Sequence, residues 1–351
     1  MKRFCTVVVA LALSGCAMVD TVTSVATGID VRVPSNPDTV VWGHLPAARP
    51  PVARLRSGQT AAIDTVSHQG LINGTDPVQF FAQAGIPARD VLPDAIAIYN
   101  KVTRPKDAGV HVLTGPLYIE GAEPGDMLEV RVLDLDVRVP YGVNNSNKGT
   151  GVLPDLHAKP YPKVIKFDYL RNVAVFAPRI EIPLAPFMGI MAVTPPGGLP
   201  NTRPPGAYGG NMDFSLLVKG STLYLPVLQS GALFYTGDAH AVQGDGEVNG
   251  TAIETSLTAV LQFVVRKGAG KNMKWPRAED RDSWYVMGMD ADLNAALKQA
   301  AQETVDFLVR EKGMTPADAY ALASIAANFI VGEAVDQVQL VYAQIPKSIF
   351  R

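Results

Sequence analysis

Proline and glycine are spread along the whole sequence instead of being gathered in linkers. The chain carries 27 prolines and 31 glycines among its 351 residues. Proline removes a backbone donor and glycine permits tight turns, so this even spread limits most of the chain to short elements joined by turns. Such a pattern is typical of a β-rich protein.

Apolar alternation then predicts where the strands lie. Between Met127 and Val137, apolar residues alternate with charged ones, as on a strand with one buried face. The alternation slips at Val132-Leu133, which predicts a β-bulge there. Runs rich in β-branched and aromatic residues predict further strands at residues 40–42, 61–66, 222–229, 256–266 and 338–345.

Clear helix signals are concentrated near the C-terminus. Asp290 is expected to cap a helix over residues 291–312, and Gly313 is expected to end it. Thr315 begins a second helix that runs through Ala327. These patterns indicate a β-sandwich core over residues 40–270 and an α+β C-terminal part over residues 271–351 that packs on the core.

The first residues are interpreted as a targeting signal and not as part of the fold. Lys2 and Arg3 precede an apolar run over residues 4–13, which is too short to span a bilayer permanently. The motif Leu13-Ser14-Gly15-Cys16 resembles a lipobox, so residues 1–15 would be removed and Cys16 would carry a lipid. The alternative is a simple secretory signal. Residues 16–39 would form a tether, with the protein anchored on the periplasmic side of the cell envelope, at the outer membrane.

Five segments resemble the acetamidase/formamidase family, in the same order as in that family. The longest is residues 237–254, and the others are residues 64–68, 114–126, 209–213 and 344–350. The resemblance spans about residues 40–351. It implies a jelly-roll-like β-sandwich with an added α+β unit. It also implies hydrolysis of formamide, acetamide and related short amides, commonly by proteins that carry a divalent metal.

Several routes to amide hydrolysis are excluded by the sequence. The two cysteines are Cys5, which would leave with the signal, and Cys16, which would carry the lipid, so no disulfide and no thiolate nucleophile are expected in the mature protein. Neither a Gly-x-Ser-x-Gly motif nor a His-Glu-x-x-His motif is present. The net charge of −2 without a basic stripe argues against nucleic acid as a partner.

Carboxylates and imidazoles remain as the candidate chemical groups. Asp238 and His240 are two apart, so a strand would place both side chains on one face. We expect His68, Asp238 and His240 to bind a divalent metal, with Asp64 as a fourth ligand, since such nitrogen and oxygen ligands suit Zn²⁺ or Mn²⁺, with zinc favoured. Glu254 is then the candidate general base.

Further residues near these groups are assigned catalytic or substrate-binding roles. Asp245 and Glu247 are placed with Glu254 as catalytic, although Asp245-Gly-Glu247 could also be a tight turn. Tyr208, Asn211 and Asp213 end a segment rich in proline and glycine, and are expected to contact substrate as that segment covers the active-site mouth. The alternative for the segment is a static connector. The remaining histidines, which include His111, are interpreted as structural.

Two hypotheses of different classes follow. The first is a metal-dependent amidase that acts on a small linear amide, with a homodimer as an open option for its assembly. The second is a non-catalytic amide-binding protein or envelope interaction protein on the same fold, because a fold alone does not fix a function. The ionisable residues within residues 237–254 favour the enzyme.

Overall fold

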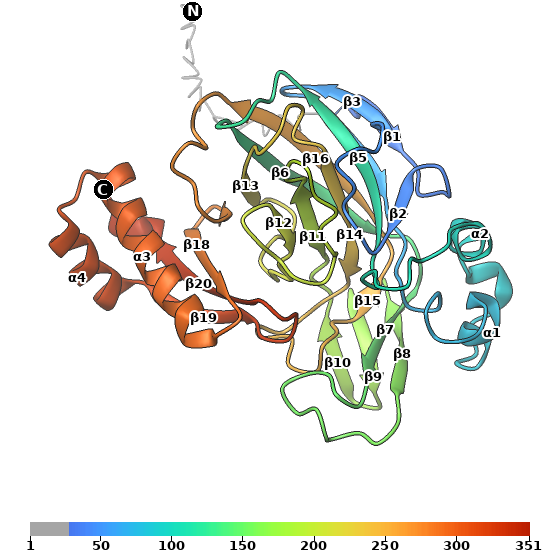
Figure 1. Cartoon of the computed structure of the whole chain (residues 1–351). Helices are drawn as coiled ribbons and strands as arrows, with labels where there is room; N and C mark the ends of the chain where they lie inside the picture. Colours follow the sequence, from blue (N-terminus) through green and yellow to red (C-terminus); the bar gives the residue numbers. More distant parts are fainter. Residues whose placement is uncertain (1–27) are drawn as a thin grey trace, which may run out of the picture.

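Two large β-sheets dominate the computed structural model, which describes residues 28–351 (Figure 1). The expected signal peptide and the lipidation site Cys16 lie outside the described residues. The sheets confirm the prediction of a mainly β, sandwich-like fold. Within residues 28–351, no helix has both the length and the apolar character needed to cross a membrane.

The first sheet has nine strands and is antiparallel except for the parallel pair β1–β4. Its spatial order is β1 (Val31–Val33), β4 (Thr60–Asp64), β16 (Leu257–Arg266), β6 (Met127–Val137), β13 (Thr222–Pro226), β17 (Arg277–Glu279), β18 (Ser283–Asp290), β20 (Gln339–Pro346) and β19 (Asn328–Glu333).

The second sheet has eleven strands. Its main path is β10 (Ile180–Pro183), β9 (Val173–Ala177), β8 (Tyr161–Asp168), β7 (Tyr141–Ser146), β15 (Glu254–Thr255), β14 (Phe234–His240), β11 (Phe187–Val193) and β12 (Gly209–Asn211). β5 (Val112–Glu120) joins β14 and carries β2 (Val40–Trp42) and β3 (Ala53–Arg56). The described helices are α1 (Pro77–Ala82), α2 (Pro93–Lys101), α3 (Leu293–Lys312), α4 (Pro316–Ala326) and the 3₁₀ turns η1 (Ala88–Asp90) and η2 (Lys347–Ile349).

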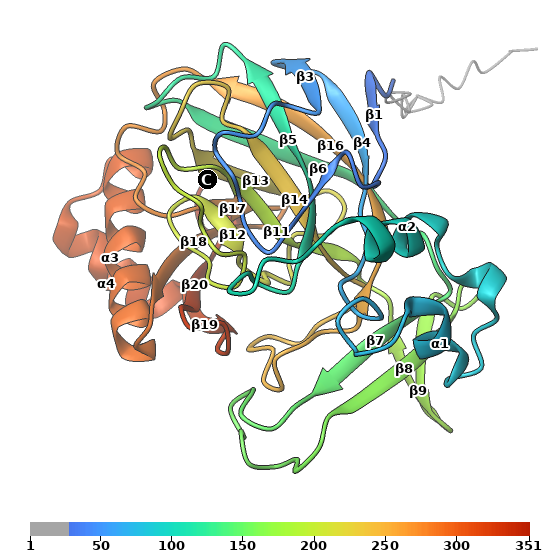
Figure 2. The ribbon, with the colours of Figure 1, turned by 45° about the vertical axis from the view of Figure 1, so that its right-hand side comes forward.

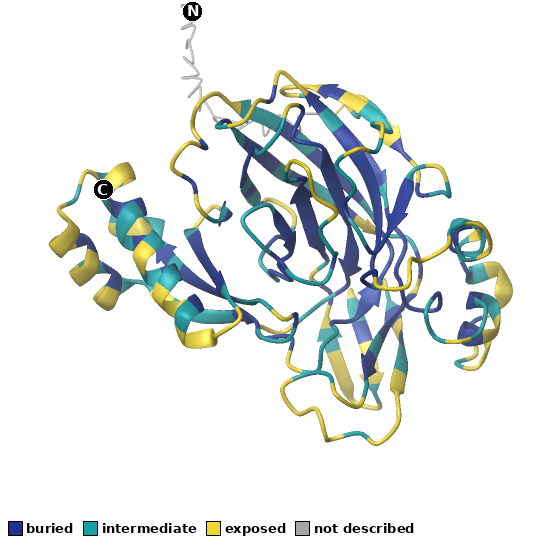
Figure 3. Ribbon diagram, in the orientation of Figure 1, coloured by how far each residue is buried: buried dark blue, intermediate teal, exposed yellow. Residues whose placement is uncertain are grey.

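The main hydrophobic core lies between the two sheets, where buried residues concentrate in Figure 3. Leu117 and Phe234 enter it from the eleven-stranded sheet, and Val130 and Phe263 from the nine-stranded sheet. The rings of Phe234 and Phe263 meet edge to face with centroids 4.9 Å apart. Each fully buried side chain of this size contributes about 1.5–3 kcal/mol, so the core fixes the two sheets face to face.

The bulge predicted in β6 is present. β16 pairs with β6 so that Val260 faces Asp134 while Leu261 faces Val132, which leaves Leu133 as the extra residue. An extra residue bends a strand and increases its local twist. The slip in apolar alternation at Val132-Leu133 is therefore confirmed as a bulge.

The C-terminal part continues the nine-stranded sheet and does not form a separate layer. β13 pairs with β17, and β18, β20 and β19 follow, so residues 271–351 share backbone hydrogen bonds with the core. The cap of α3 corrects the prediction: Asp292, not Asp290, accepts the hydrogen bond from the backbone N–H of Ala295. Gly313 ends α3 in the left-handed conformation, as predicted.

The ordered fold begins earlier than expected. Residues 31–33 lie within the expected tether, yet they form β1 and pair in parallel with residues 61–63 of β4. Val33 is buried in the main core. Burial of Val33 against that core explains why this short segment is a strand and not a tether, and it corrects the assignment of residues 16–39 over its last part.

The eleven-stranded sheet divides at β14. β14 pairs with β5 as far as Gly237, and its pairing with β15 begins at Ala239, two residues further along. The β7–β9 part therefore diverges from the β5 part, as Figure 2 shows. Asp238 stands at the point of division, which places it between the two branches of the sheet.

Candidate metal centre and active site

Two neighbouring strands carry the centre of the site. Asp238 and His240 lie on β14, and their side chains meet with the Asp238 Oδ2 and His240 Nε2 atoms 3.5 Å apart. Glu254 on β15 is the cross-strand partner of His240, and its Oε2 lies 3.3 Å from His240 Nε2. The two-residue spacing thus brings Asp238 and His240 together, as the sequence predicted.

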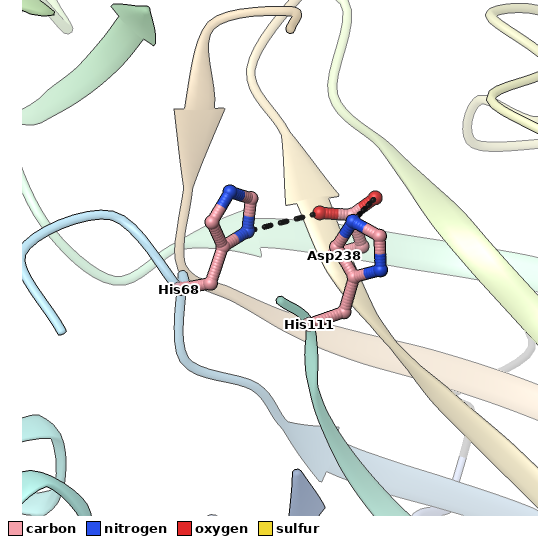
Figure 4. Close-up of side chains that lie close together, drawn as sticks. All are labelled: His68, His111 and Asp238. Carbon is pink, nitrogen blue, oxygen red and sulfur yellow. Dashed lines mark ion pairs between the residues drawn. The ribbon is translucent and has the colours of Figure 1, made fainter. Parts of the chain in front are cut away.

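Two histidines from other segments complete the cluster around Asp238 (Figure 4). His68 follows β4, and its Nδ1 lies 3.5 Å from Asp238 Oδ1. His111 directly precedes β5, and its Nε2 lies 3.7 Å from Asp238 Oδ2. The two imidazole rings meet edge to face with centroids 5.2 Å apart, so both point at the same carboxylate from different segments.

Each of these two histidines uses its other ring nitrogen to fix its orientation. His68 Nε2 lies 3.0 Å from the side-chain amide of Gln69, and His111 Nδ1 lies 3.1 Å from the hydroxyl of Thr202. Histidines that bind metals usually hydrogen-bond through the second nitrogen in this way, which sets the tautomer and the ring direction. His68 and His111 therefore each present one free nitrogen to Asp238.

The donor set fits a divalent cation. Buried atoms without a hydrogen-bond partner among residues 28–351 include His68 Nδ1, Asp238 Oδ1 and both ring nitrogens of His240. The nitrogen–oxygen separations of 3.3–3.8 Å exceed ordinary hydrogen bonds. Two ligands about 2.1 Å from a tetrahedral zinc lie roughly 3.4 Å from each other, so these separations suit atoms that share an ion.

The electrostatics of the cluster follow from burial and from mutual charge. Burial alone would raise the pKa of Asp238. The charges of His111 and His240 outweigh burial and hold this pKa well below its usual range. Burial alone would lower the pKa of His240. The charges of Glu254 and Asp238 outweigh burial and raise this pKa well above its usual range. Burial lowers the pKa of His111 to about 4, against an opposing effect of Asp238. His111 is thus held as a neutral imidazole, the form that binds metals.

A second group of buried acidic residues borders the cluster around Asp238. Asp213 Oδ1 lies 3.8 Å from His240 Nε2, and Asp213, His240 and Glu247 form a further set that could hold a cation. Burial raises the pKa of Asp213, and the charge of Glu247 raises it further. Burial also raises the pKa of Glu247, and the charge of Asp336 raises it further. The amide of Asn211 donates to Asp213 over 2.8 Å and also to Asp336. Asp336, whose pKa burial raises to about 6, was not predicted as a site residue.

Three of these carboxylates lie on strained backbone. Asp213, Asp238 and Glu247 have φ values of 42°, 54° and 44°, a region that residues with side chains rarely occupy. Gly189 lies beside them on β11, and a Cβ there would collide with the carboxylate of Asp213 and the ring of His240. Strained residues of this kind persist where the surroundings hold them, and they are common at functional sites.

A small cavity joins both groups. Its volume is about 90 Å³, and its walls include His68, His111, Asp213, Asp238, Glu247 and Glu254. Asn211, Asp336, Arg203 and Asn145 also line it. Larger hollows of about 360–490 Å³ are present on the described surface, and the largest of these shares Ile72, Asn145 and Asn147 with the small cavity. None of them contains a buried histidine, so the chemistry assigns the site to the smaller cavity.

Three predicted site residues lie away from the cavity. Asp64 accepts a hydrogen bond from Thr258 over 2.6 Å, within the nine-stranded sheet, and is not part of the ligand cluster. Asp245 is exposed and accepts from Ser215 and Tyr342. Tyr208 donates to the carbonyl of Pro204.

These positions correct three expectations. Asp64 does not serve as a fourth ligand, since its side chain is directed to a neighbouring strand. Asp245 does not share the catalytic position of Glu247, because Gly246 and Glu247 both have positive φ values and turn the chain between them. Tyr208 packs against the hydrophobic core, so this side chain does not reach the cavity that Asn211 and Asp213 line.

The comparisons with known proteins agree with this geometry. Residues 98–203 and 199–351 match the family described as "Acetamidase/Formamidase family". An acetamidase of Mycolicibacterium smegmatis is 27% identical over 203 residues, which are 40% of this chain and 50% of that protein. A formamidase of Methylophilus methylotrophus is 26% identical over 192 residues, 40% of this chain and 47% of that protein. The alignments thus span about half the length of these two relatives.

A solved structure extends the likeness to almost the whole fold. The crystal structure of an acetamidase from Bacillus halodurans superposes with a TM-score of 0.75 at 26% sequence identity, and the match covers 91% of this chain and 98% of that one. The family match covers most of the chain, including β14, β15 and the carboxylates of the second group. The chain therefore belongs to the acetamidase/formamidase family.

Proposed function

We propose that this protein hydrolyses the C–N bond of small linear amides, similar to formamide and acetamide, to a carboxylate and ammonia, and that it depends on a divalent metal. One observation carries the proposal. Three buried imidazoles converge on Asp238, which lines a small cavity together with Glu254, in a chain that belongs to the acetamidase/formamidase family. The names of the two relatives, an acetamidase and a formamidase, support the substrate class.

Two sets of potential ligands share Asp238: His68 and His111 belong to one, and His240 and Glu254 to the other. The residues that would hold the metal are His68, His111, Asp238 and His240, and we propose zinc because nitrogen and carboxylate ligands suit it. When bound, such an ion lowers the pKa of a water molecule and polarises the amide carbonyl. The outer contacts of His68 with Gln69 and of His111 with Thr202 would keep the two rings in place.

Glu254 would move the proton that the reaction requires. Its Oε1 accepts a hydrogen bond from the backbone N–H of Ala252 over 3.0 Å, which fixes the carboxylate. Its Oε2 is buried and has no hydrogen-bond partner in the described part of the chain. Glu254 would take a proton from the attacking water and deliver it to the amide nitrogen, so that the C–N bond breaks and ammonia leaves.

The size of the cavity limits the substrate. Its volume of about 90 Å³ is well below the roughly 300–1,000 Å³ that is typical of pockets for drug-sized ligands. Within the cavity itself, only a small acyl group would fit beside the carboxamide. This agrees with short linear amides as the substrate class.

The direct test is ammonia release from formamide and acetamide by the purified protein. We expect equal amounts of ammonia and carboxylate, loss of activity after dialysis against a chelator, and recovery on addition of zinc. Metal-loaded protein that releases no ammonia from either amide would contradict the proposal and would favour a non-catalytic amide-binding protein. Activity that survives complete removal of metal would contradict the metal dependence alone.

We also propose that Cys16 carries a lipid that anchors the protein on the periplasmic side of the cell envelope, at the outer membrane. The support is the motif Leu13-Ser14-Gly15-Cys16 after a short apolar run. Cys16→Ser is expected to block processing or to release the protein from the membrane fraction. Fractionation of lysed cells followed by immunoblotting checks this, and a wild-type protein found only in the soluble fraction would contradict it.

A further inference from the structure

The side chain of Asn145 makes no hydrogen bond within the described residues, although it is buried. Asn145 lies on β7 and is 6% exposed, and its Oδ1 has no partner among residues 28–351. A buried polar atom without a partner is destabilising, and native proteins rarely keep one without a reason. Asn145 lines the cavity of the candidate active site, so its carbonyl oxygen is available to whatever the cavity holds.

The register of the strands places Asn145 next to the reacting groups. Glu254 pairs with His240 on one side and with Val143 of β7 on the other. Asn145 is two residues beyond Val143, so both side chains stand on the same face of the sheet. Asn145 is then the diagonal neighbour of Glu254, with Cα atoms roughly 7–8 Å apart. Both side chains line the cavity, so a bound carboxamide could contact both.

The backbone around Asn145 is held independently of its side chain. The backbone N–H of Asn145 donates to Thr251 Oγ1 over 2.8 Å, and that hydroxyl donates back to Asn145 O over 3.1 Å. The amide of Asn144 donates to the carbonyls of Thr251 and Ala252, both over 2.9 Å. The amide of Asn249 donates to Ser146 Oγ over 2.9 Å. These bonds fix the position of Asn145 while its own amide stays free.

The chemistry of the cavity separates Asn145 from its neighbours. Two unpartnered atoms at the cavity are neutral carbonyl oxygens, Asn145 Oδ1 and Asn211 Oδ1, and the amide of Asn211 is already held by Asp213 and Asp336. The others belong to His68, Asp213, Asp238 and Glu254, which are ionisable and suited to a metal or a proton. Asn145 is neutral and lies beside Glu254, the group that would deliver a proton to the leaving nitrogen. A neutral carbonyl acceptor at this place matches a neutral N–H donor of the substrate.

We propose that Asn145 accepts a hydrogen bond from the N–H of the substrate carboxamide and thereby makes the site prefer amides to esters. The inference rests on the proposed amide hydrolysis. An ester has an oxygen without a proton where the amide has its nitrogen, so it leaves the Asn145 carbonyl unpaired. Sites that hydrogen-bond a substrate N–H discriminate strongly against analogues that lack it.

The test compares kcat/KM for acetamide and for methyl acetate in several variants. Asn145→Leu, which has a similar shape and no acceptor, is expected to lower the amide-to-ester ratio roughly tenfold to a hundredfold. Asn145→Asp keeps an acceptor and is expected to retain the preference for the amide. Bound metal is expected to be unchanged in both variants, which separates this role from that of a ligand.

Ser146→Ala is the matched control. Ser146 is the next residue on β7 and belongs to the same set of hydrogen bonds, but it does not line the cavity, so the ratio should stay at the wild-type value. Asn145→Ala serves as a second variant if Asn145→Leu does not fold, as judged by thermal unfolding.

Two outcomes would overturn the inference. An unchanged ratio in Asn145→Leu or Asn145→Ala would show that water or nothing pairs with this carbonyl. Equal loss of the preference in Asn145→Leu and Asn145→Asp would show that the acceptor is not what matters. If the wild type hydrolyses acetamide and the variants keep its amide-to-ester ratio, only this inference is contradicted. If the wild type does not hydrolyse amides, the proposed function is contradicted as well.

Discussion

Glu254→Gln is expected to lower kcat for acetamide roughly 10²–10⁴-fold, the range that general acid–base catalysis contributes. Glutamine can keep the hydrogen bond that Glu254 Oε1 accepts from Ala252, so the local fold should survive. It cannot accept and return a proton. Because His68, His111, Asp238 and His240 remain, the bound metal should be retained.

The measurement is steady-state ammonia release together with metal analysis of the same preparation. Asp245→Asn is the matched control, because it removes a carboxylate from the same segment that lies outside the cavity. We expect its kcat to remain near the wild-type value. Full activity in Glu254→Gln would sink the assignment of the general base, and loss of metal in that variant would make Glu254 a ligand instead.

Local patterns were sufficient to predict much of the secondary structure. The bulge in β6 was predicted because one extra residue shifts the apolar alternation of a strand that is buried on one face. Gly313 was recognised as a helix end because the left-handed conformation there suits glycine. Both features depend only on neighbouring residues, so the sequence shows them directly.

Features that depend on distant partners were harder to predict. β1 forms only because residues 31–33 pair with residues 61–63 of β4, and nothing in its three residues indicates this pairing. The continuity of the sheet into residues 271–351 likewise depends on the pairing of β13 with β17. Non-local pairing of this kind explains why the expected tether was corrected over its last part, and why the sequence did not indicate that residues 271–351 extend the nine-stranded sheet.

The candidate site shows the same division. Asp238 and His240 share a strand, so their spacing indicated that they lie together. His111 and Asp336 come from segments far away in the sequence and stand alone there, so no spacing marked them. The interpretation of His111 as structural is corrected by its position, because its Nε2 faces Asp238 and its Nδ1 meets Thr202.

His240→Ala is expected to abolish stoichiometric metal binding and, with it, amide hydrolysis. His240 is 1% exposed, and neither of its ring nitrogens has a hydrogen-bond partner within the described chain. Its Nε2 faces Asp213, Asp238 and Glu254 at once. Loss of this imidazole removes the ring nitrogen that faces all three carboxylates. The loss of affinity should exceed the roughly 10–100-fold that the removal of an outer-shell partner causes.

The measurement is metal content per chain after purification and dialysis at a defined free zinc concentration, with thermal unfolding to confirm the fold. The ring of His240 packs edge to face on Phe187 with centroids 4.9 Å apart, so alanine leaves a void, and His240→Gln is included because it fills more of that space. His157→Ala is the control, since this ring stacks on Tyr161 away from the cluster and its loss should leave metal content unchanged.

Equal metal content in wild type and in both His240 variants would show that the ion binds elsewhere. Loss of metal in both variants, with the fold retained, would support His240 as a ligand, because His68, His111 and Asp238 would then be unable to hold the ion alone.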